Sequence, residues 1–246
     1  MERGVERFTT ISIEVRNFAL VTHAVPAHRL RAHLPDPYTL ETFHDEGGIE
    51  RCLVSATCFC NGDFRWSALP YPRLTFDEST FRTYVTHRGR RGVYFLRRFL
   101  SRPLAFFPQR LFEMKVALGD FDVDTGVDPA GYERYSCTVR SRDVTNAFVV
   151  RARDEPVPRF PFETSDELVD RITYRLHGFF SSSAGAQGHM PVSHRPMTPW
   201  WGELVSARFD TWSDLGILEP DEASKAHSVL VEPIVNFRLH PARPLV

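Results

Sequence analysis

Short stretches of alternating apolar and polar residues recur along the chain and give the first indication of its fold. In residues 11–16 every second residue is aliphatic, with serine, glutamate and arginine between. This period of two predicts a half-buried β-strand. Further strands are predicted at residues 39–43, 49–60, 80–87, 92–99, 114–118, 132–140, 144–153, 192–194, 204–209 and 229–239.

Helix signals are fewer and shorter than strand signals. Pro26 predicts the start of a short helix, because proline is favoured at a first helical position. Thr164 and Glu167 have the spacing of a capping box and predict a second helix that begins there. A third short helix is predicted over residues 104–112.

The balance of these elements predicts the fold class. Many short strands beside few helices, without regular alternation of the two, favour a mainly β (α+β) fold. The expected architecture is an antiparallel β-barrel or cone-like sheet with two or three short helices. The clearest hairpin joins residues 80–87 to residues 92–99 through an arginine-rich turn. No repeat or linker divides the chain, so we expect a single domain over residues 1–246.

The composition is that of a globular protein. Hydrophobic residues make up 42% and charged residues 25%, and 30 basic residues balance 31 acidic ones to a net charge of −1. These values exclude a disordered chain and a strongly basic nucleic-acid scaffold. The N-terminus does not resemble a signal peptide and no run of about 18 apolar residues occurs, so we expect a cytoplasmic protein without a membrane span. The four cysteines are expected to be reduced thiols.

Patterns of metal ligands are weak in this sequence. His189 and His194 are five residues apart, which matches neither a helical pair nor a zinc finger. The aspartates of residues 120–128 lack the glycine and glutamate positions of a calcium loop, so we expect an acidic, solvent-exposed turn there. We therefore expect no metal and no cofactor. His194 and Arg195 follow a loop of small residues and are candidates for ligand contacts.

Arginines are concentrated in residues 79–112, which hold eight of them and no acidic residue. One interpretation is a docking surface for an acidic partner or nucleic acid, although the near-neutral chain disfavours nucleic acid. The other is a site for a small anion, because arginine binds a carboxylate as a planar fork. Arg82 and Tyr84 share one face of their predicted strand, and Arg97 lies on the partner strand. If that face lines an interior, these arginines would hold a carboxylate.

Amine chemistry has two candidates in this chain, Lys115 and Lys225. Glu113 and Lys115 are two residues apart on a predicted strand and so face the same way. In an apolar pocket, a lysine of lowered pKa can form a Schiff base, with Glu113 as its proton shuttle. On an exposed sheet edge the same two residues would form an ion pair that contributes little to stability.

Six segments carry a resemblance to a known family. Residues 17–22, 25–26, 30–35, 81–85, 92–95 and 193–197 read NFALVT, VP, LRAHLP, FRTYV, GVYF and SHRPM. In these segments the chain resembles an uncharacterised domain family of the acetoacetate decarboxylase-like superfamily, and the likeness runs over most of the chain. The resemblance implies a β-barrel or cone-like sheet with an internal pocket for a small molecule, in agreement with the predicted strands.

The resemblance also identifies a departure at the catalytic centre. Acetoacetate decarboxylases use a lysine pair after a Gly-Arg-Glu strand, and one lysine forms the Schiff base. Here Arg97 and Arg98 stand near the position of the lysine pair, and Arg91 or Gly92 stands in place of the glutamate. Arginine cannot form a Schiff base because it is not deprotonated in proteins. Decarboxylation by the family's mechanism would require Lys115 to lie in the same pocket.

The favoured hypothesis is a small-molecule pocket protein that binds a small carboxylate or keto compound. Its anion-binding residues would be Arg82, Arg97 and Arg98, with Tyr84 as a hydrogen-bond partner. The first alternative is a decarboxylase or other lyase with Lys115 as the Schiff-base amine. The second is a noncatalytic interaction protein that uses the arginine-rich segment. The sequence leaves the oligomeric state open, and a homo-oligomer is compatible with it.

Overall fold

The computed structural model describes residues 10–69, 71–102, 116–128, 131–142, 144–154 and 160–245. The strands are β1 (Ile11–Pro26), β2 (Thr39–Leu40), β3 (Thr42–His44), β4 (Glu50–Trp66), β5 (Leu74–His87), β6 (Arg90–Leu100), β7 (Ala117–Leu118), β8 (Asp120–Asp128), β9 (Gly131–Ser141), β10 (Val144–Arg153), β11 (His177–Ser181), β12 (Gln187–Ser193), β13 (Trp200–Phe209), β14 (Ser228–Leu239) and β15 (Arg243–Pro244). The helices in the described part are α2 (Ala27–Arg31), α4 (Ser165–Thr173) and α5 (Asp210–Asp214).

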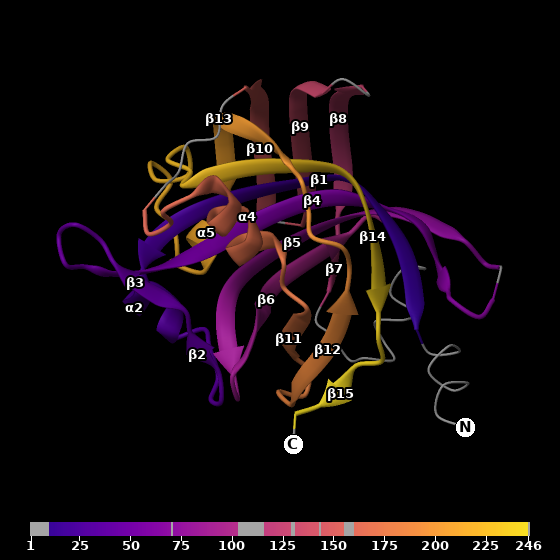
Figure 1. The fold of residues 1–246 in the computed structure, drawn as a ribbon, viewed down its shortest axis with the longest axis horizontal. Coiled ribbons are helices and arrows are strands. Elements are labelled where there is room, and N and C mark those ends of the chain that lie inside the picture. The colour runs from indigo at the N-terminus through magenta and orange to yellow at the C-terminus, as the bar shows by residue number, and fades with distance from the viewer. Residues whose placement is uncertain are drawn as a thin grey trace.

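Seven of these strands pair side by side into a ring (Figure 1). Their order is β14-β1-β4-β5-β6-β11-β12, and β12 pairs again with β14 to close the ring. The pair β11–β6 is parallel, whereas the other neighbours in the ring are antiparallel. The predicted mainly β fold, with an antiparallel barrel or cone-like sheet, is confirmed.

The remaining long strands form a second layer against the outside of the ring. β13, β10, β9 and β8 continue from β14 in that order and stand together along the upper edge of Figure 1. The ring of Phe81 on β5 meets Trp212 of α5 with centroids 5.0 Å apart. The hydroxyl of Tyr135 on β9 donates to the carbonyl oxygen of Cys58 on β4 over 3.1 Å. The outer faces of β4 and β5 are therefore covered, which explains the long buried runs in both strands.

The helix α4 packs on the interior face of the ring and begins at the predicted capping residue. The side chain of Thr164 accepts a hydrogen bond from the backbone N–H of Glu167 over 3.1 Å, so the predicted helix start is confirmed. Leu168 and Ile172 are one turn apart on one face of the helix and are fully buried. They belong to the same apolar cluster as Tyr84 of β5. The helix therefore contacts the interior of the ring and not the second layer.

The structure confirms the hairpin of β5 and β6 and corrects the prediction for the acidic stretch. Residues Asp120–Asp128 form the strand β8 and not a turn. Phe121 and Val123 are half-buried there, while the aspartates that alternate with them are exposed. This is a strand pattern of period two that the density of aspartates obscured. The helix predicted over residues 104–112 lies outside the described residues.

Three further observations concern the whole described part of the chain. All four cysteines are free thiols, as predicted. No helix among the described residues is long and apolar enough to span a bilayer. Within the same ranges, no three His, Cys, Asp or Glu side chains lie close enough together to hold a metal ion.

Candidate functional site

Polar side chains fill the middle of the ring's interior face, where buried residues are normally apolar. Thr22 of β1 pairs with Ser55 of β4, and Ser55 pairs with Arg82 of β5, so their side chains face the same way. A hydrogen bond of 2.9 Å joins the hydroxyls of Thr22 and Ser55, and one of 2.7 Å joins Ser55 to the hydroxyl of Tyr84. All four residues are buried. Buried hydroxyls are costly without partners, so this bonded chain is an ordered polar surface inside the ring.

A second polar group lies beside the first, further along the same strands. The hydroxyls of Thr57 and Thr80 share a hydrogen bond of 2.7 Å. Glu78 accepts hydrogen bonds from the amide of Asn61 and from Nε of Arg98, both over 3.0 Å. The side chains of Glu78 and Arg98 are 7% and 8% exposed, so the carboxylate balances the charge of this guanidinium within the interior.

A β-bulge in β6 decides which of the two neighbouring arginines enters the interior. Phe81 pairs with Arg97 and Thr80 pairs with Arg98, while Leu96 is an extra residue in β6. If Leu96 paired with Phe81, as in a regular ladder, Arg97 would stand opposite Thr80 and would face the interior. The bulge instead places Arg98 on the interior face and leaves Arg97 exposed on the other side. The structure therefore separates two residues that the sequence predicted as one anion-binding pair.

Arg82 differs from the other interior arginines because its charge has no carboxylate partner among the described residues. It is 9% exposed, and one Nη donates to the backbone carbonyl oxygen of Ile172 over 3.4 Å. Its Nε is buried without a hydrogen-bond partner. The guanidinium lies over the ring of Phe18, with its central carbon 5.7 Å from the ring centroid. Burial lowers the pKa of Arg82 from its usual range, which reflects the cost of holding this cation away from water.

Arg175 also contacts Tyr84, but its charge is balanced by a carboxylate. Its two Nη atoms donate to the carboxylate of Glu41 over 2.8 and 2.9 Å, and its guanidinium lies over the Tyr84 ring. Burial opposes ionisation of Glu41, but hydrogen bonds from Arg175 and Arg91 outweigh burial and lower the pKa of this carboxyl. Sequence reasoning missed both residues, because they are 134 positions apart and neither stands in a motif.

His194 directly follows β12, at an end of the ring. Its Nδ1 is 2.7 Å from the carbonyl oxygen of Arg195, and its Nε2 is buried without a partner. The imidazole packs against Phe237 and Tyr174, with ring centroids 4.4 and 5.4 Å apart. It also lines a cleft of about 540 Å³ between the ends of β1, β4, β12 and β14. Burial lowers the pKa of His194, and the nearby charge of Arg82 acts in the same direction.

Arg195 holds the segment after β12 against β14. Its Nη2 donates to Oε1 of Glu232 over 2.7 Å and to the carbonyl oxygen of Ile234 over 2.9 Å. The other oxygen of Glu232 accepts from the backbone N–H of Thr198 over 2.8 Å. Glu232 is 1% exposed, and burial raises its pKa. These contacts fix the position of the neighbouring His194.

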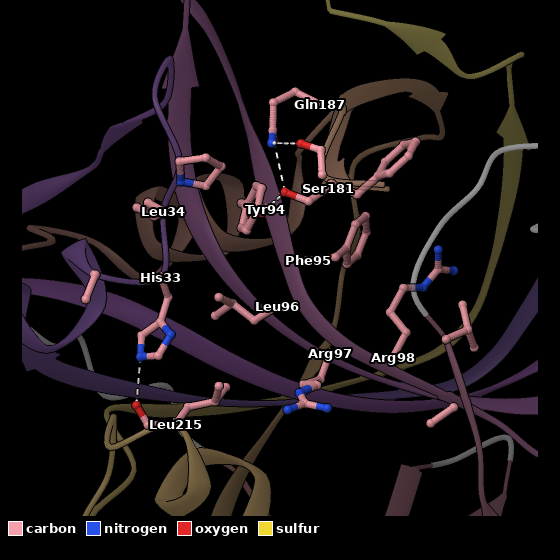
Figure 2. A pocket seen from close by; sticks show the side chains of 16 residues that line it. His33, Leu34, Tyr94, Phe95, Leu96, Arg97, Arg98, Ser181, Gln187 and Leu215 are labelled. Carbon is pink, nitrogen blue, oxygen red and sulfur yellow. Dashed lines mark hydrogen bonds between the residues drawn. The ribbon is translucent and has the colours of Figure 1, made fainter. Parts of the chain in front are cut away.

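A second cavity, of about 700 Å³, lies beside β6 and contains the exposed Arg97 (Figure 2). Arg98 also reaches its wall. Further along the cavity, away from Arg97 in Figure 2, the hydroxyl of Tyr94 bonds to that of Ser181 over 2.7 Å, and Ser181 donates to the amide oxygen of Gln187 over 3.1 Å. The predicted anion-binding residues are thus divided between this cavity and the ring interior.

Lys115 and Glu113, the candidates for Schiff-base chemistry, lie outside the described residues. The structure therefore brings together Arg82, Tyr84 and Arg98 on one interior face, with His194 near Arg82. It places Arg97 on the opposite side of β6.

Comparison with known proteins identifies the family. The sequence profile of DUF2071, described as "Uncharacterized conserved protein", matches residues 12–235, which is most of the chain. The chain belongs to the DUF2071 family. No curated protein matches this DUF2071 chain by sequence.

Solved structures with the same fold include an acetoacetate decarboxylase-like enzyme, an enduracididine biosynthesis enzyme and an acetoacetate decarboxylase. An acetoacetate decarboxylase-like enzyme from Sphingomonas wittichii RW1 superimposes with a TM-score of 0.65 at 12% identity, over 97% of the DUF2071 chain and 93% of its own. The enduracididine biosynthesis enzyme MppR gives a TM-score of 0.64 at 14% identity, over 96% and 88%. The acetoacetate decarboxylase of Legionella pneumophila gives 0.61 at 14% identity, over 97% and 87%. The predicted membership of an uncharacterised family is confirmed, and so is the fold that the resemblance implied.

Proposed function

We propose that this DUF2071 protein binds a small carboxylate inside the ring, with Arg82 as the anion-binding group. The observation that carries the proposal is a buried guanidinium without a carboxylate partner among the described residues. An ionic group held away from water is costly unless an opposite charge lies beside it. A ligand carboxylate would supply that charge and would accept a hydrogen bond from Nε of Arg82.

A keto acid is the class of carboxylate that fits best. The hydroxyl of Tyr84 lies on the same interior face as Arg82 and donates to the carbonyl oxygen of Ile172 over a long 3.4 Å. A keto oxygen would replace that distant carbonyl as the acceptor. Two neighbours in fold point to the same class of compound. MppR has been solved with pyruvate, and another neighbour is an acetoacetate decarboxylase.

Titration calorimetry with pyruvate and acetoacetate tests the site. Replacing Arg82 with glutamine removes a charged partner of the ligand, which costs about 2 kcal/mol or more, or roughly 30-fold in Kd. Arg97→Gln is the matched control, because Arg97 carries the same charge on the opposite side of β6. We expect this control to bind like the wild type.

The reverse result would place the ligand elsewhere. If Arg97→Gln abolishes binding and Arg82→Gln does not, the ligand occupies the cavity of Figure 2 and the proposal is wrong. Arg98 is a poor test residue, because its removal would also leave the buried carboxylate of Glu78 without this arginine. A thermal unfolding scan of each variant shows whether it is folded.

The decarboxylase or lyase alternative is supported by the acetoacetate decarboxylases among the neighbours in fold. It requires an amine, and the chain has two, Lys115 and Lys225. Borohydride reduction in the presence of pyruvate, followed by mass spectrometry, would label an amine that forms a Schiff base. Selective labelling of Lys115 supports the lyase. No labelling, or equal labelling of both lysines, contradicts it and leaves carboxylate binding by Arg82 as the function.

A further inference from the structure

The tautomer of His194 is fixed by its surroundings. Its Nδ1 lies 2.7 Å from the carbonyl oxygen of Arg195. A carbonyl oxygen accepts hydrogen bonds and does not donate them, so Nδ1 carries the proton. In the neutral ring Nε2 therefore carries a lone pair. This Nε2 is buried and has no hydrogen-bond partner.

The position of the His194 imidazole suits a group that exchanges protons between the interior of the sheet and solvent. The imidazole lines the cleft of about 540 Å³ at the end of the ring, while its Nε2 is covered by protein. The aromatic rings of Tyr174 and Phe237 pack against this imidazole. Arg195, clamped by Glu232, supplies the carbonyl that sets the tautomer. His194 is thus a rigidly placed proton acceptor and not a mobile surface histidine.

Arg82 lies close to this segment, because Phe18, whose ring its guanidinium covers, pairs with Glu232, the partner of Arg195. The charge of Arg82 acts on His194, and each residue has a buried nitrogen without a partner. A proton acceptor beside a carboxylate anchor is the arrangement needed to remove a proton next to a carbonyl group.

We propose that His194 is a general base that removes a proton from the carbon next to the keto group of a 2-keto acid. The inference rests on the proposed carboxylate site at Arg82. In the step, the C–H bond breaks and an N–H bond forms at Nε2. The C–H electron pair becomes a C=C bond, and the carbonyl π electrons move to oxygen to give an enolate. The imidazolium then returns a proton, or a deuteron in D₂O, to the same carbon, so no oxidant or co-reactant is consumed.

Exchange of the pyruvate methyl protons with D₂O, followed by proton NMR, tests this step. We expect the wild type to exchange them faster than buffer. His194→Asn keeps a donor in the place of Nδ1 and removes Nε2. At saturating pyruvate it should exchange at least about 100-fold more slowly, in line with the usual contribution of a general base. Its Kd for pyruvate should change less than threefold.

Control variants separate a base from a merely structural histidine. His240→Gln removes another imidazole near the same end of the ring, one that contacts Ser193, and should exchange like the wild type. His194→Gln serves as the second test variant if thermal unfolding shows that His194→Asn does not fold. A structural role for His194 would change Kd and thermal stability and leave the exchange rate of the saturated complex unchanged.

Three further results would overturn the role of His194 as a base. Pyruvate bound through Arg82 without exchange above buffer overturns the role of His194 and leaves the carboxylate site intact. Exchange that persists in His194→Asn but disappears in Lys115→Arg assigns the step to an amine and also overturns it. If pyruvate does not bind, the role of His194 fails, and if acetoacetate does not bind either, the proposed carboxylate site fails as well.

Discussion

Arg82, Arg98 and Arg175 are three buried arginines along β5, β6 and the end of α4, and they differ in how their charges are balanced. Arg98 binds the carboxylate of Glu78, and Arg175 binds that of Glu41. Arg82 has a carbonyl contact but no carboxylate among the described residues. Side chains that lower the stability of the ligand-free protein are typical of binding sites, because the bound ligand compensates for the loss of stability.

We predict that Arg82→Met stabilises the ligand-free protein. A methionine of similar length keeps the apolar contacts and removes an uncompensated charge, which should raise the free energy of unfolding by about 1–3 kcal/mol. Urea unfolding measures the difference. Arg175→Met is the matched control and should destabilise the protein by about 1–3 kcal/mol, because it removes a partner of Glu41. A less stable Arg82→Met would show that the contact with Ile172 outweighs the desolvation of the charge.

A second prediction concerns His23, which is 1% exposed and hydrogen-bonded to the carbonyl oxygen of Ala223. Burial lowers its pKa from 6.5 to about 4. Below pH 6.5 the unfolded chain binds a proton that the folded protein does not bind until about pH 4, so stability falls as the pH decreases between these values. The loss is about 1.4 kcal/mol per pH unit, or about 3 kcal/mol in total.

Urea unfolding at pH 7 and pH 4.5 checks this prediction. His23→Gln keeps a donor for Ala223 and cannot titrate, so its stability should depend less on pH than that of the wild type. His28→Gln replaces an exposed histidine and should keep the full pH dependence. An unchanged pH dependence in His23→Gln would assign the acid sensitivity to other groups.

At the scale of the elements, the sequence predicted where the strands lie better than which of their side chains face the interior. The alternation in residues 80–99 specified the hairpin, but the extra residue Leu96 has no sequence signal of its own. A shift of one residue moves every later side chain to the other face of the sheet. In a regular hairpin Arg97 would face the interior, whereas here Arg98 does. The ion pair of Glu41 with Arg175 was beyond prediction for another reason, since no local pattern links residues so distant in sequence.

The cap of α4 gives a prediction at this scale. Thr164→Ala removes the acceptor for the N–H of Glu167 and should destabilise the protein by about 1 kcal/mol. Because Ile172 accepts the hydrogen bond from Arg82, a frayed α4 should also weaken pyruvate binding. Hydrogen exchange of the α4 amides and titration calorimetry measure the two effects. Thr164→Ser retains the hydroxyl and should resemble the wild type in both.

At the scale of the whole molecule, the hairpin of β11 and β12 closes the ring through short junctions. β11 joins β6 through the pairs of Gly178 with Val93 and Phe179 with Tyr94. β12 joins β14 through two further pairs. On this side, few strand pairs enclose the interior that contains Arg82. Substitutions at the junctions should therefore lower the stability of the protein even where the residue is small.

Gly92 tests this view of the ring. A Cβ atom at this position would lie 2.3 Å from the carbonyl oxygen of His177 and 2.7 Å from the ring of Phe179, so Gly92→Ala should force β6 and β11 apart. We expect a loss of about 1–3 kcal/mol, or a decrease in Tm of roughly 2–12 °C for a chain of this size. Gly126→Ala has ordinary contacts at 3.5 Å and should leave Tm nearly unchanged. Equal Tm values for the two variants would contradict the importance of the junction.

The pairing of β1 with β14 has a consequence for synthesis. Ile11 pairs with Leu239 and Thr22 with Ser228. One partner of β1 is therefore β14, which is synthesised long after it. During translation β1 can pair with β4 early, but its other edge stays open until β14 has left the ribosome. Such distant contacts slow folding, and an open strand edge invites aggregation. A ribosome stalled before β14 would therefore carry a nascent chain that needs chaperones and cannot bind ligand.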